Sequence, residues 1–118
     1  MIIEQLINKG EGKNIDFKRQ IILDSKKNKS EFIKDIISLA NSSKDTGYLI
    51  IGVDDDKTII GNSDKYPSEE QIQQISHTYI NPPVNIIYSI NSLNNHNILV
   101  LEVKALRKPH KICRDIDK

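Results

Sequence analysis

The sequence predicts an α+β fold, in which two to three helices pack on a mixed, mostly antiparallel sheet of about five strands. Two observations support this prediction: segments with helical periodicity alternate with short apolar runs, and the later apolar runs come in pairs. The chain has 118 residues, of which 37% are hydrophobic, and this is enough for one core. We therefore expect a single domain over residues 1–118.

The first elements should be one short helix and one strand. Residues 2–9 carry apolar side chains at i, i+3 and i+4, the spacing of an amphipathic helix, and Gly10 would end it. Residues 14–22 then alternate between apolar and polar side chains, as a half-buried strand does.

The main helix is expected over residues 31–41. Its apolar side chains recur at i, i+3, i+4 and i+7 from Ile33 onward, and Ser30 fits an N-cap before it. Residues 24–29 show no periodicity, so they predict a solvated loop that leads into this helix.

The centre of the chain predicts a β-hairpin. Residues 48–53 form a continuous apolar run that is too short for a helix and typical of a strand buried on both faces. Residues 58–61 follow an acidic turn and would pair with this central strand.

A third helix and a second strand pair should complete the fold. Ser68 and Gln71 have capping-box spacing, which predicts a helix over residues 69–79, and the Pro-Pro pair that follows must end it. Residues 84–90 and 97–103 then read as two strands joined by a polar turn.

Charge is balanced overall but segregated along the chain. The 17 Lys+Arg and 16 Asp+Glu give a net charge of +1, which excludes a globally basic protein. Residues 104–118 nevertheless carry a local charge of +4, and residues 54–70 carry −4. Any nucleic-acid site must therefore be a local patch.

Several classes of site and location are excluded or disfavoured. Cys113 is the only cysteine, which excludes an internal disulfide and a Cys-rich zinc site and favours a reducing compartment. No apolar run approaches the roughly 18 residues of a membrane span, and the start lacks the basic residues of a signal peptide. We expect a cytoplasmic protein with no membrane contact. His77, His96 and His110 lack ligand spacing and are expected at the surface.

Acidic residues beside the first strand suggest one kind of chemistry. Asp16 and Lys18 are two residues apart and would project from the same strand face. Metal-dependent phosphodiester cleavage uses a carboxylate to hold Mg²⁺ or Mn²⁺ and a lysine to stabilise charge. Glu11 and Asp54 would complete a three-carboxylate site. The alternative is that these carboxylates are solvated, with Asp16 in a salt bridge to Lys18 or Arg19.

Basic residues form two groups that could contact phosphates. Such contacts depend on charge and need no base recognition. The alternative is an ordinary charged surface. The first group flanks the predicted loop and the second lies in the C-terminal tail: Lys18, Arg19, Lys26, Lys27 and Lys29, then Arg107, Lys108, His110, Lys111 and Arg114.

Three ordered stretches resemble a known family. They are GEGKNIDFK at residues 10–18, SLANS at residues 38–42 and GYLIIGVDD at residues 47–55. In this order they resemble the AlbA-like DNA-binding domain of Schlafen proteins, and INPP at residues 80–83 and RKPH at residues 107–110 fit as well. The resemblance covers nearly the whole chain and implies a Schlafen AlbA-like fold.

The resemblance also has departures. Asp16 stands where the family usually has Glu, and the usual glycine pair is reduced to Gly47. The chain also stops where the family normally adds another strand, so we expect an N-terminal fragment of a longer protein with further C-terminal domains.

Three functional hypotheses follow. The first is a domain that binds DNA or structured RNA within a larger regulator or defence protein. The second is a Mg²⁺- or Mn²⁺-dependent endoribonuclease, because some Schlafen proteins are RNA endonucleases whose three acidic residues match Glu11, Asp16 and Asp54, with Lys18 beside them. The third is a dimerisation or interaction domain that uses an exposed sheet edge.

Overall fold

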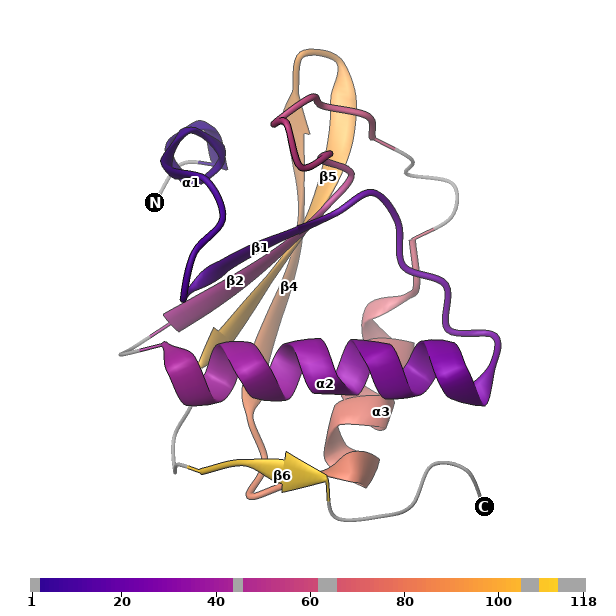
Figure 1. The fold of residues 1–118 in the computed structure, drawn as a ribbon. Coiled ribbons are helices and arrows are strands. Elements are labelled where there is room, and N and C mark those ends of the chain that lie inside the picture. The colour runs from indigo at the N-terminus through magenta and orange to yellow at the C-terminus, as the bar shows by residue number, and fades with distance from the viewer. Residues whose placement is uncertain (1–2, 44–45, 62–65, 105–108, 113–118) are drawn as a thin grey trace.

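The computed structural model describes residues 3–43, 46–61, 66–104 and 109–112 (Figure 1). The helices in these ranges are α1 (Ile3–Lys9), α2 (Lys26–Ser42) and α3 (Glu69–Tyr79). The strands are β1 (Ile15–Lys18), β2 (Thr46–Ile51), β3 (Ile80–Asn81), β4 (Asn85–Leu93), β5 (His96–Lys104) and β6 (Lys111–Ile112). None of these helices is long and apolar enough to cross a membrane.

The main sheet has four strands in the order β1-β2-β5-β4. β1 and β2 are parallel, whereas the β2–β5 and β4–β5 pairs are antiparallel. β3 and β6 form a separate small antiparallel pair. These findings confirm the predicted α+β class with a mixed, mostly antiparallel sheet and three helices.

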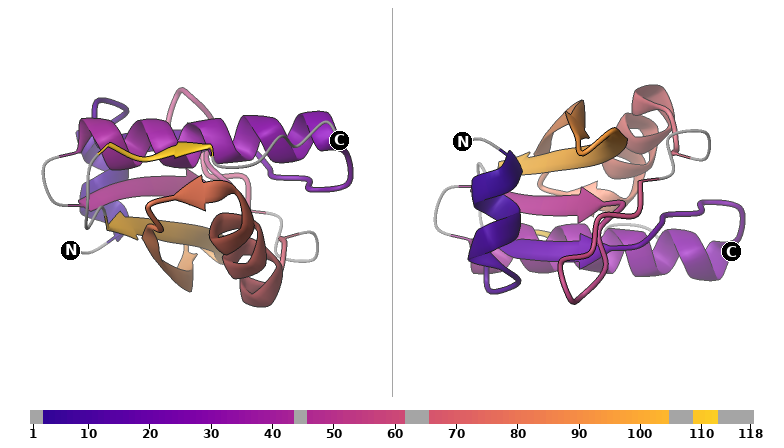
Figure 2. Two further views of the ribbon diagram at one scale, coloured as in Figure 1. Left: turned by 90° about the horizontal axis from the view of Figure 1, so that it is seen from below. Right: turned by 90° about the horizontal axis from the view of Figure 1, so that it is seen from above.

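Helices cover both faces of the main sheet (Figure 2). α2 and α3 pack on one face, and α1 packs on the other. Residues 49–51 of β2 are 0% exposed, as their continuous apolar run predicts. Phe17 of β1 joins the α1 side, so strand alternation directs Asp16 and Lys18 toward the α2 side.

α2 begins earlier than its sequence pattern predicts. The N-cap is Ser25 and not Ser30, because the Ser25 hydroxyl oxygen accepts a hydrogen bond from the Asn28 N–H at 3.1 Å. The Asn28 amide also donates to Asp24 at 2.9 Å. The predicted loop over residues 24–29 is therefore wrong over most of its length. Two serines can each cap a helix, and periodicity alone favours the one nearer the apolar residues.

The two predicted hairpins differ in outcome. After β2 the predicted pairing is limited to an isolated bridge between Val53 and Ile59 and to a few hydrogen bonds, such as that from the Asp54 N–H to the Thr58 carbonyl oxygen at 2.9 Å. Gly52 has a φ of +106°, so the chain bends at the end of the strand. The β4–β5 hairpin is confirmed and is longer than predicted. Its two-residue turn, Asn94 and Asn95, has positive φ at both positions, as a type I′ turn requires.

α3 lies where the sequence predicts it. The Ser68 hydroxyl oxygen accepts from the Gln71 N–H at 3.1 Å at its start, and the helix ends at Tyr79. The chain then continues into β3, which pairs with β6 near the C-terminal end of α2. The β3–β6 pair was not predicted, because two-residue strands leave no periodic signal.

Candidate functional site

The C-terminal end of α2 holds two distant parts of the chain in place. The His110 N–H donates to Asn41 Oδ1 at 2.8 Å, and Asn41 Nδ2 donates to the His110 carbonyl oxygen at 3.0 Å. The Ser42 hydroxyl donates to the Lys13 carbonyl oxygen at 2.6 Å. Asn41 therefore anchors the segment that enters β6, and Ser42 anchors the loop that carries Glu11.

A glycine allows α2 and β2 to approach closely at this same end. A Cβ atom on Gly47 would lie 2.7 Å from Ser43 Oγ and 3.0 Å from Leu39 Cβ. Larger residues would thus push β2 away from α2. Residues Asn41, Ser42 and Gly47 of the recognised motifs therefore shape the fold around the site and are not themselves reactive.

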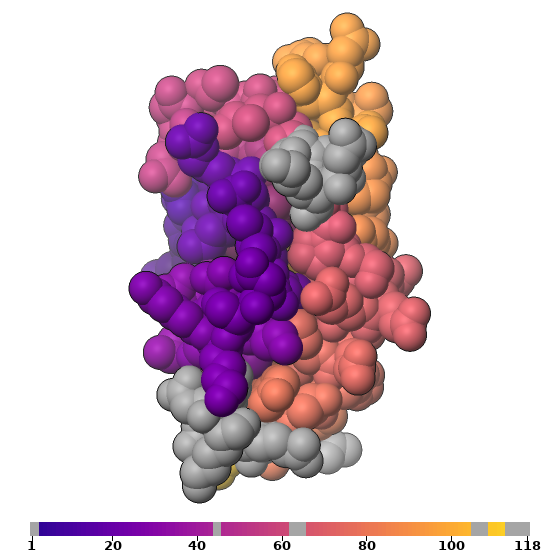
Figure 3. Space-filling view, turned by 90° about the vertical axis from the view of Figure 1, so that its right-hand side faces the viewer, coloured from indigo at the N-terminus to yellow at the C-terminus, as the bar shows by residue number. Residues whose placement is uncertain are grey.

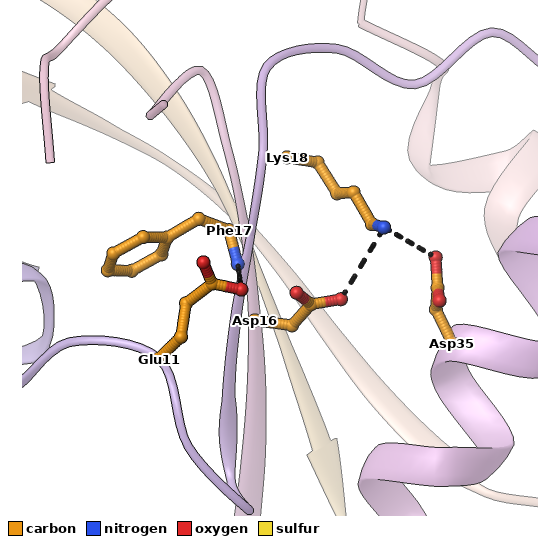
Figure 4. Close-up of polar contacts among 5 residues, drawn as sticks. All are labelled: Glu11, Asp16, Phe17, Lys18 and Asp35. Carbon is orange, nitrogen blue, oxygen red and sulfur yellow. Dashed lines mark hydrogen bonds and ion pairs between the residues drawn. The ribbon is translucent and has the colours of Figure 1, made fainter. Parts of the chain in front are cut away.

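Lys18 lies between two carboxylates on the polar face of β1 (Figure 4). Its Nζ is 3.7 Å from Asp16 Oδ2 and 3.3 Å from Asp35 Oδ2. Asp35 belongs to α2, so this contact joins the helix to the edge strand of the sheet. The salt bridge from Asp16 to Lys18, one of the two alternatives from the sequence, is present.

Glu11 approaches the same strand from the loop after α1. Its Oε2 accepts a hydrogen bond from the Phe17 N–H at 3.5 Å (Figure 4). Partial burial raises the pKa of Glu11, and the nearby Asp16 carboxylate raises that pKa further. The Glu11 carboxylate is therefore less readily ionised than a carboxylate in water.

The Lys18–Asp35 ion pair affects its two partners differently. Burial lowers the pKa of Lys18, but the attraction of Asp16 and Asp35 outweighs it, so the net pKa is raised. Burial raises the pKa of Asp35, and the attraction of Lys18 offsets this only in part. The charged form of Lys18 is therefore favoured, whereas ionisation of the half-buried Asp35 carboxylate costs stability.

Two hollows flank this ion pair. One of about 300 Å³ is lined on its acidic side by Glu11, Asp16 and Asp35, and Ser42 also borders it. The other, of about 430 Å³, lies toward the start of α2 and includes Asn28 in its lining. The lining of the first hollow also includes Lys13, but its three carboxylates outnumber this cation and oppose entry of an anion.

The three-carboxylate metal site is not assembled in the described structure. Asp54 lies beside Arg19, with 3.9 Å between its Oδ2 and Arg19 Nε. Within residues 3–43, 46–61, 66–104 and 109–112, no three His, Cys, Asp or Glu side chains form a group that could hold a metal ion. The residues present do not fit the Mg²⁺ or Mn²⁺ site that the resemblance implies, and we derive no metal-dependent step.

The first basic group divides between two places. Lys18 is already engaged by carboxylates, and the Arg19 side chain is 71% exposed beyond the end of β1. Lys26, Lys27 and Lys29 occupy the first turn of α2, which contains no acidic residue. Figure 3 views the molecule from the side on which α2 begins.

The second basic group is only partly described. Arg107, Lys108 and Arg114 lie outside the described residues. Lys111 is exposed in β6. His110 is 2% exposed, so its expected surface position is wrong. Its contact with nucleic acid stays a prediction. The ring is buried because Asn41 holds its backbone and its Nδ1 contacts the Pro82 carbonyl oxygen.

Asp35 is a residue of the site that the sequence pattern does not identify. Its position in the sequence offers one signal, because it stands between Ile33 and Ile36 at the border of the apolar face of α2. A carboxylate at that border must contact a neighbouring element or be partly desolvated. Its partner, Lys18, is distant in sequence and could not be identified from periodicity.

Comparisons with known proteins identify one family and two solved structures of similar fold. Residues 11–116 match the family Schlafen, AlbA_2, whereas no curated protein matches. The N-terminal domain of a RecG-related protein from Nitrosomonas europaea has a similar fold, with a TM-score of 0.63 and 19% identity over 93% of this chain and 79% of that one. The DIP2311 protein from Corynebacterium diphtheriae has a TM-score of 0.62 and 15% identity over 92% of this chain, which spans only 22% of that protein. The chain belongs to the Schlafen, AlbA_2 family.

Proposed function

We propose that this chain is a nucleic-acid-binding domain of a larger regulator or defence protein, and that the first turn of α2 contacts the phosphate backbone. The observation that carries this proposal is the placement of Lys26, Lys27 and Lys29 at the N-terminal end of a 17-residue helix. The helix dipole disfavours cations there and favours anions. Three lysines at this end therefore cost stability, and a bound phosphate would remove that cost.

Binding of phosphate explains the three lysines at the start of α2 better than a role in stabilising the helix does. Ser25 already satisfies one free N–H at the helix start, and Asn28 is held by Asp24. The lysines are therefore not needed to cap the helix. Lysines beside the positive end of a helix dipole attract a polyanion without reading its bases. We expect weakly specific binding whose affinity falls steeply with salt.

The acidic hollow beside Lys18 is not suited to contact the phosphate backbone. Glu11, Asp16 and Asp35 would repel a phosphate that approached it. Lys18 is neutralised by two of these carboxylates, so its own share in binding is expected to be small. Arg19 is far more exposed, and it lies beside Asp54.

The relatives support the class of ligand. The Nitrosomonas neighbour is named as related to the ATP-dependent DNA helicase RecG, and this name supports nucleic acid as the class of ligand. The description of the family names no ligand.

Fluorescence anisotropy with labelled single-stranded DNA, duplex DNA and an RNA hairpin tests the proposal. The variant Lys27→Glu/Lys29→Glu should raise the Kd by about tenfold or more, because two phosphate contacts become repulsive. A matched control, Lys9→Glu/Lys104→Glu, changes the net charge equally at sites distant from the start of α2. Equal weakening by the two variants would show that only net charge matters and would contradict the proposed site.

A further inference from the structure

β4 forms one edge of the main sheet and carries no charged residue. In the described part of the chain, its nine residues pair with β5 alone, on one side and without a bulge. Natural edges are usually blunted by charges, proline or bulges, because an unpaired edge is a template for another strand. β4 has none of these protections, and Ile87 (38%) and Ile90 (46%) are exposed.

One side chain shows which backbone groups of β4 face away from β5. Gln73 of α3 donates from Nε2 to the Ile86 carbonyl oxygen at 2.7 Å, so the polar backbone groups of Ile86 point outward. Along an antiparallel strand, the backbone N–H and C=O groups of successive residues point alternately toward and away from the partner strand. The backbone groups of Tyr88, Ile90 and Ser92 must therefore point outward too. Among the described residues, none bonds to the outward groups of Ile90 or Ser92.

The free part of this edge has definite limits. It begins after Ile86, where α3 already supplies a partner, and it ends at the turn that starts with Asn94. Between them, residues 87–93 form the far end of a hairpin that extends past the other strands of the sheet (Figure 1). The exposed residues Ile87 and Ile90 lie in this part of β4, so it is open to a second strand among the described residues.

We propose that two copies of this chain pair through residues 87–93 of β4, antiparallel and about a twofold axis at Ile90. Directly opposed residues on one face of an antiparallel pair contact one another. The opposed pairs in this register are Ile90 with Ile90, Tyr88 with Ser92, Ser89 with Asn91, and Ile87 with Leu93.

The sequence of β4 favours a second copy over a foreign strand. In the twofold register, the aliphatic side chains face aliphatic side chains, and the other pairs place hydroxyl and amide groups together. No charge opposes a like charge, which would otherwise disfavour self-pairing. Both exposed isoleucines become covered, Ile90 on one face and Ile87 on the other. A twofold contact is also the commonest symmetry of oligomers.

The contact is short, so its strength should be modest. Stable interfaces bury about 1,200–2,000 Å² in total, and seven residues from each strand supply the lower end of that range at most. We therefore expect a dimer that dissociates on dilution. This inference is independent of nucleic-acid binding, because the start of α2 is not part of β4.

Sedimentation velocity of the 118-residue chain from micromolar to millimolar concentration tests the pairing. The mass should rise from 13.5 kDa toward twice that value. Ile90→Lys should remain a monomer throughout, because two ammonium groups would then face each other. The control is Ile22→Lys, an equally exposed isoleucine (44%) outside β4, which should dimerise like the original chain. A chain that stays monomeric, or a dimer that persists in Ile90→Lys, overturns the proposal.

Amide hydrogen exchange on the unmodified chain gives a second test that does not depend on folding of a variant. The outward N–H groups of Ile90 and Ser92 should exchange about tenfold more slowly at high protein concentration than at low. The Ile87 N–H, which is directed toward β5, should show no such dependence. Equal exchange of Ile90 at both concentrations also overturns the proposal.

Discussion

The two ends of α2 differ in how their charges are satisfied. The first turn carries Lys26, Lys27 and Lys29 without an acidic residue, although the helix dipole opposes cations there. About 14 Å further along the helix axis, Asp35 meets Lys18 of β1. The first turn therefore places three cations at the end of the helix where the dipole is unfavourable for them, whereas the charge in the middle of the helix joins two elements.

This difference separates a surface suited to binding from a cluster suited to structure. The lysines gain when an anion arrives, whereas Asp35, Asp16 and Glu11 already surround their cation and repel a second anion. One helix thus contains both a candidate contact for phosphate and a region that excludes it.

The largest effect on stability is expected at the C-terminal end of α2. Asn41→Ala removes both hydrogen bonds to the His110 backbone and leaves that partly buried segment without a partner. We expect a loss of about 2 kcal/mol in the free energy of unfolding, measured by urea denaturation. Asn28→Ala, which removes one exposed side-chain bond, is the control and should cost much less. Equal losses would show that Asn41 does not anchor the β6 segment.

Removal of the cation in the middle of α2 should have a smaller, pH-dependent effect. Lys18→Met leaves Asp16 and Asp35 without their cation, and we expect a loss of about 1–2 kcal/mol at pH 7. In the folded state, the pKa values of Glu11 and Asp35 are raised above their unfolded values, and burial is the largest cause. The folded form therefore binds protons more tightly, and ionisation of these groups costs stability as pH rises through the raised values.

The loss in Lys18→Met should accordingly shrink as pH falls from 7 to 4, because protonation removes the unpaired charges. Urea denaturation at several pH values measures this change. A loss that is independent of pH would indicate that Lys18 contributes by packing alone.

At the start of α2, one substitution should separate stability from binding. Lys27→Glu replaces an exposed cation by an anion near the positive end of the helix, so we expect a gain of about 0.3–1 kcal/mol in stability together with weaker nucleic-acid binding. Lys34→Glu, near the middle of the same helix, should give no such gain. Thermal unfolding of both variants checks this, and a loss of stability in Lys27→Glu would contradict the dipole argument.

The smallest effect is expected from divalent metal. Because no metal-binding group of three side chains exists among the described residues, Mg²⁺ or Mn²⁺ should shift the melting temperature by less than about 1 °C. Thermal unfolding with and without EDTA measures the shift. A rise of several degrees that disappears in Asp16→Asn would instead support the endoribonuclease hypothesis.

The sequence predicts the elements better than it predicts the site. The apolar run of β2 and the capping box of α3 identify their elements, because burial on two faces and a capped start leave local patterns. The start of α2 is missed because Ser25 and Ser30 both satisfy the rule for an N-cap. The short β3 and β6 depend on tertiary pairing and leave no local pattern.

The site needs distances that periodicity does not contain. Alternation correctly places Asp16 and Lys18 on one strand face, because that is a local property. The partner Asp35 comes from a helix that crosses the sheet, and Asp54 turns toward Arg19 where Gly52 bends the chain. His110 is buried by Asn41, which lies 69 residues away in sequence.

NMR titration of the ¹⁵N-labelled chain with a short DNA strand or an RNA hairpin is the most direct test of the proposed function. The amide signals of Lys26, Lys27 and Lys29 should shift progressively, while those of Asp16 and Asp35 should stay near their free positions. Shifts centred on Asp16 and Asp35, with the first turn of α2 unchanged, would contradict the assignment of the phosphate contact to that turn.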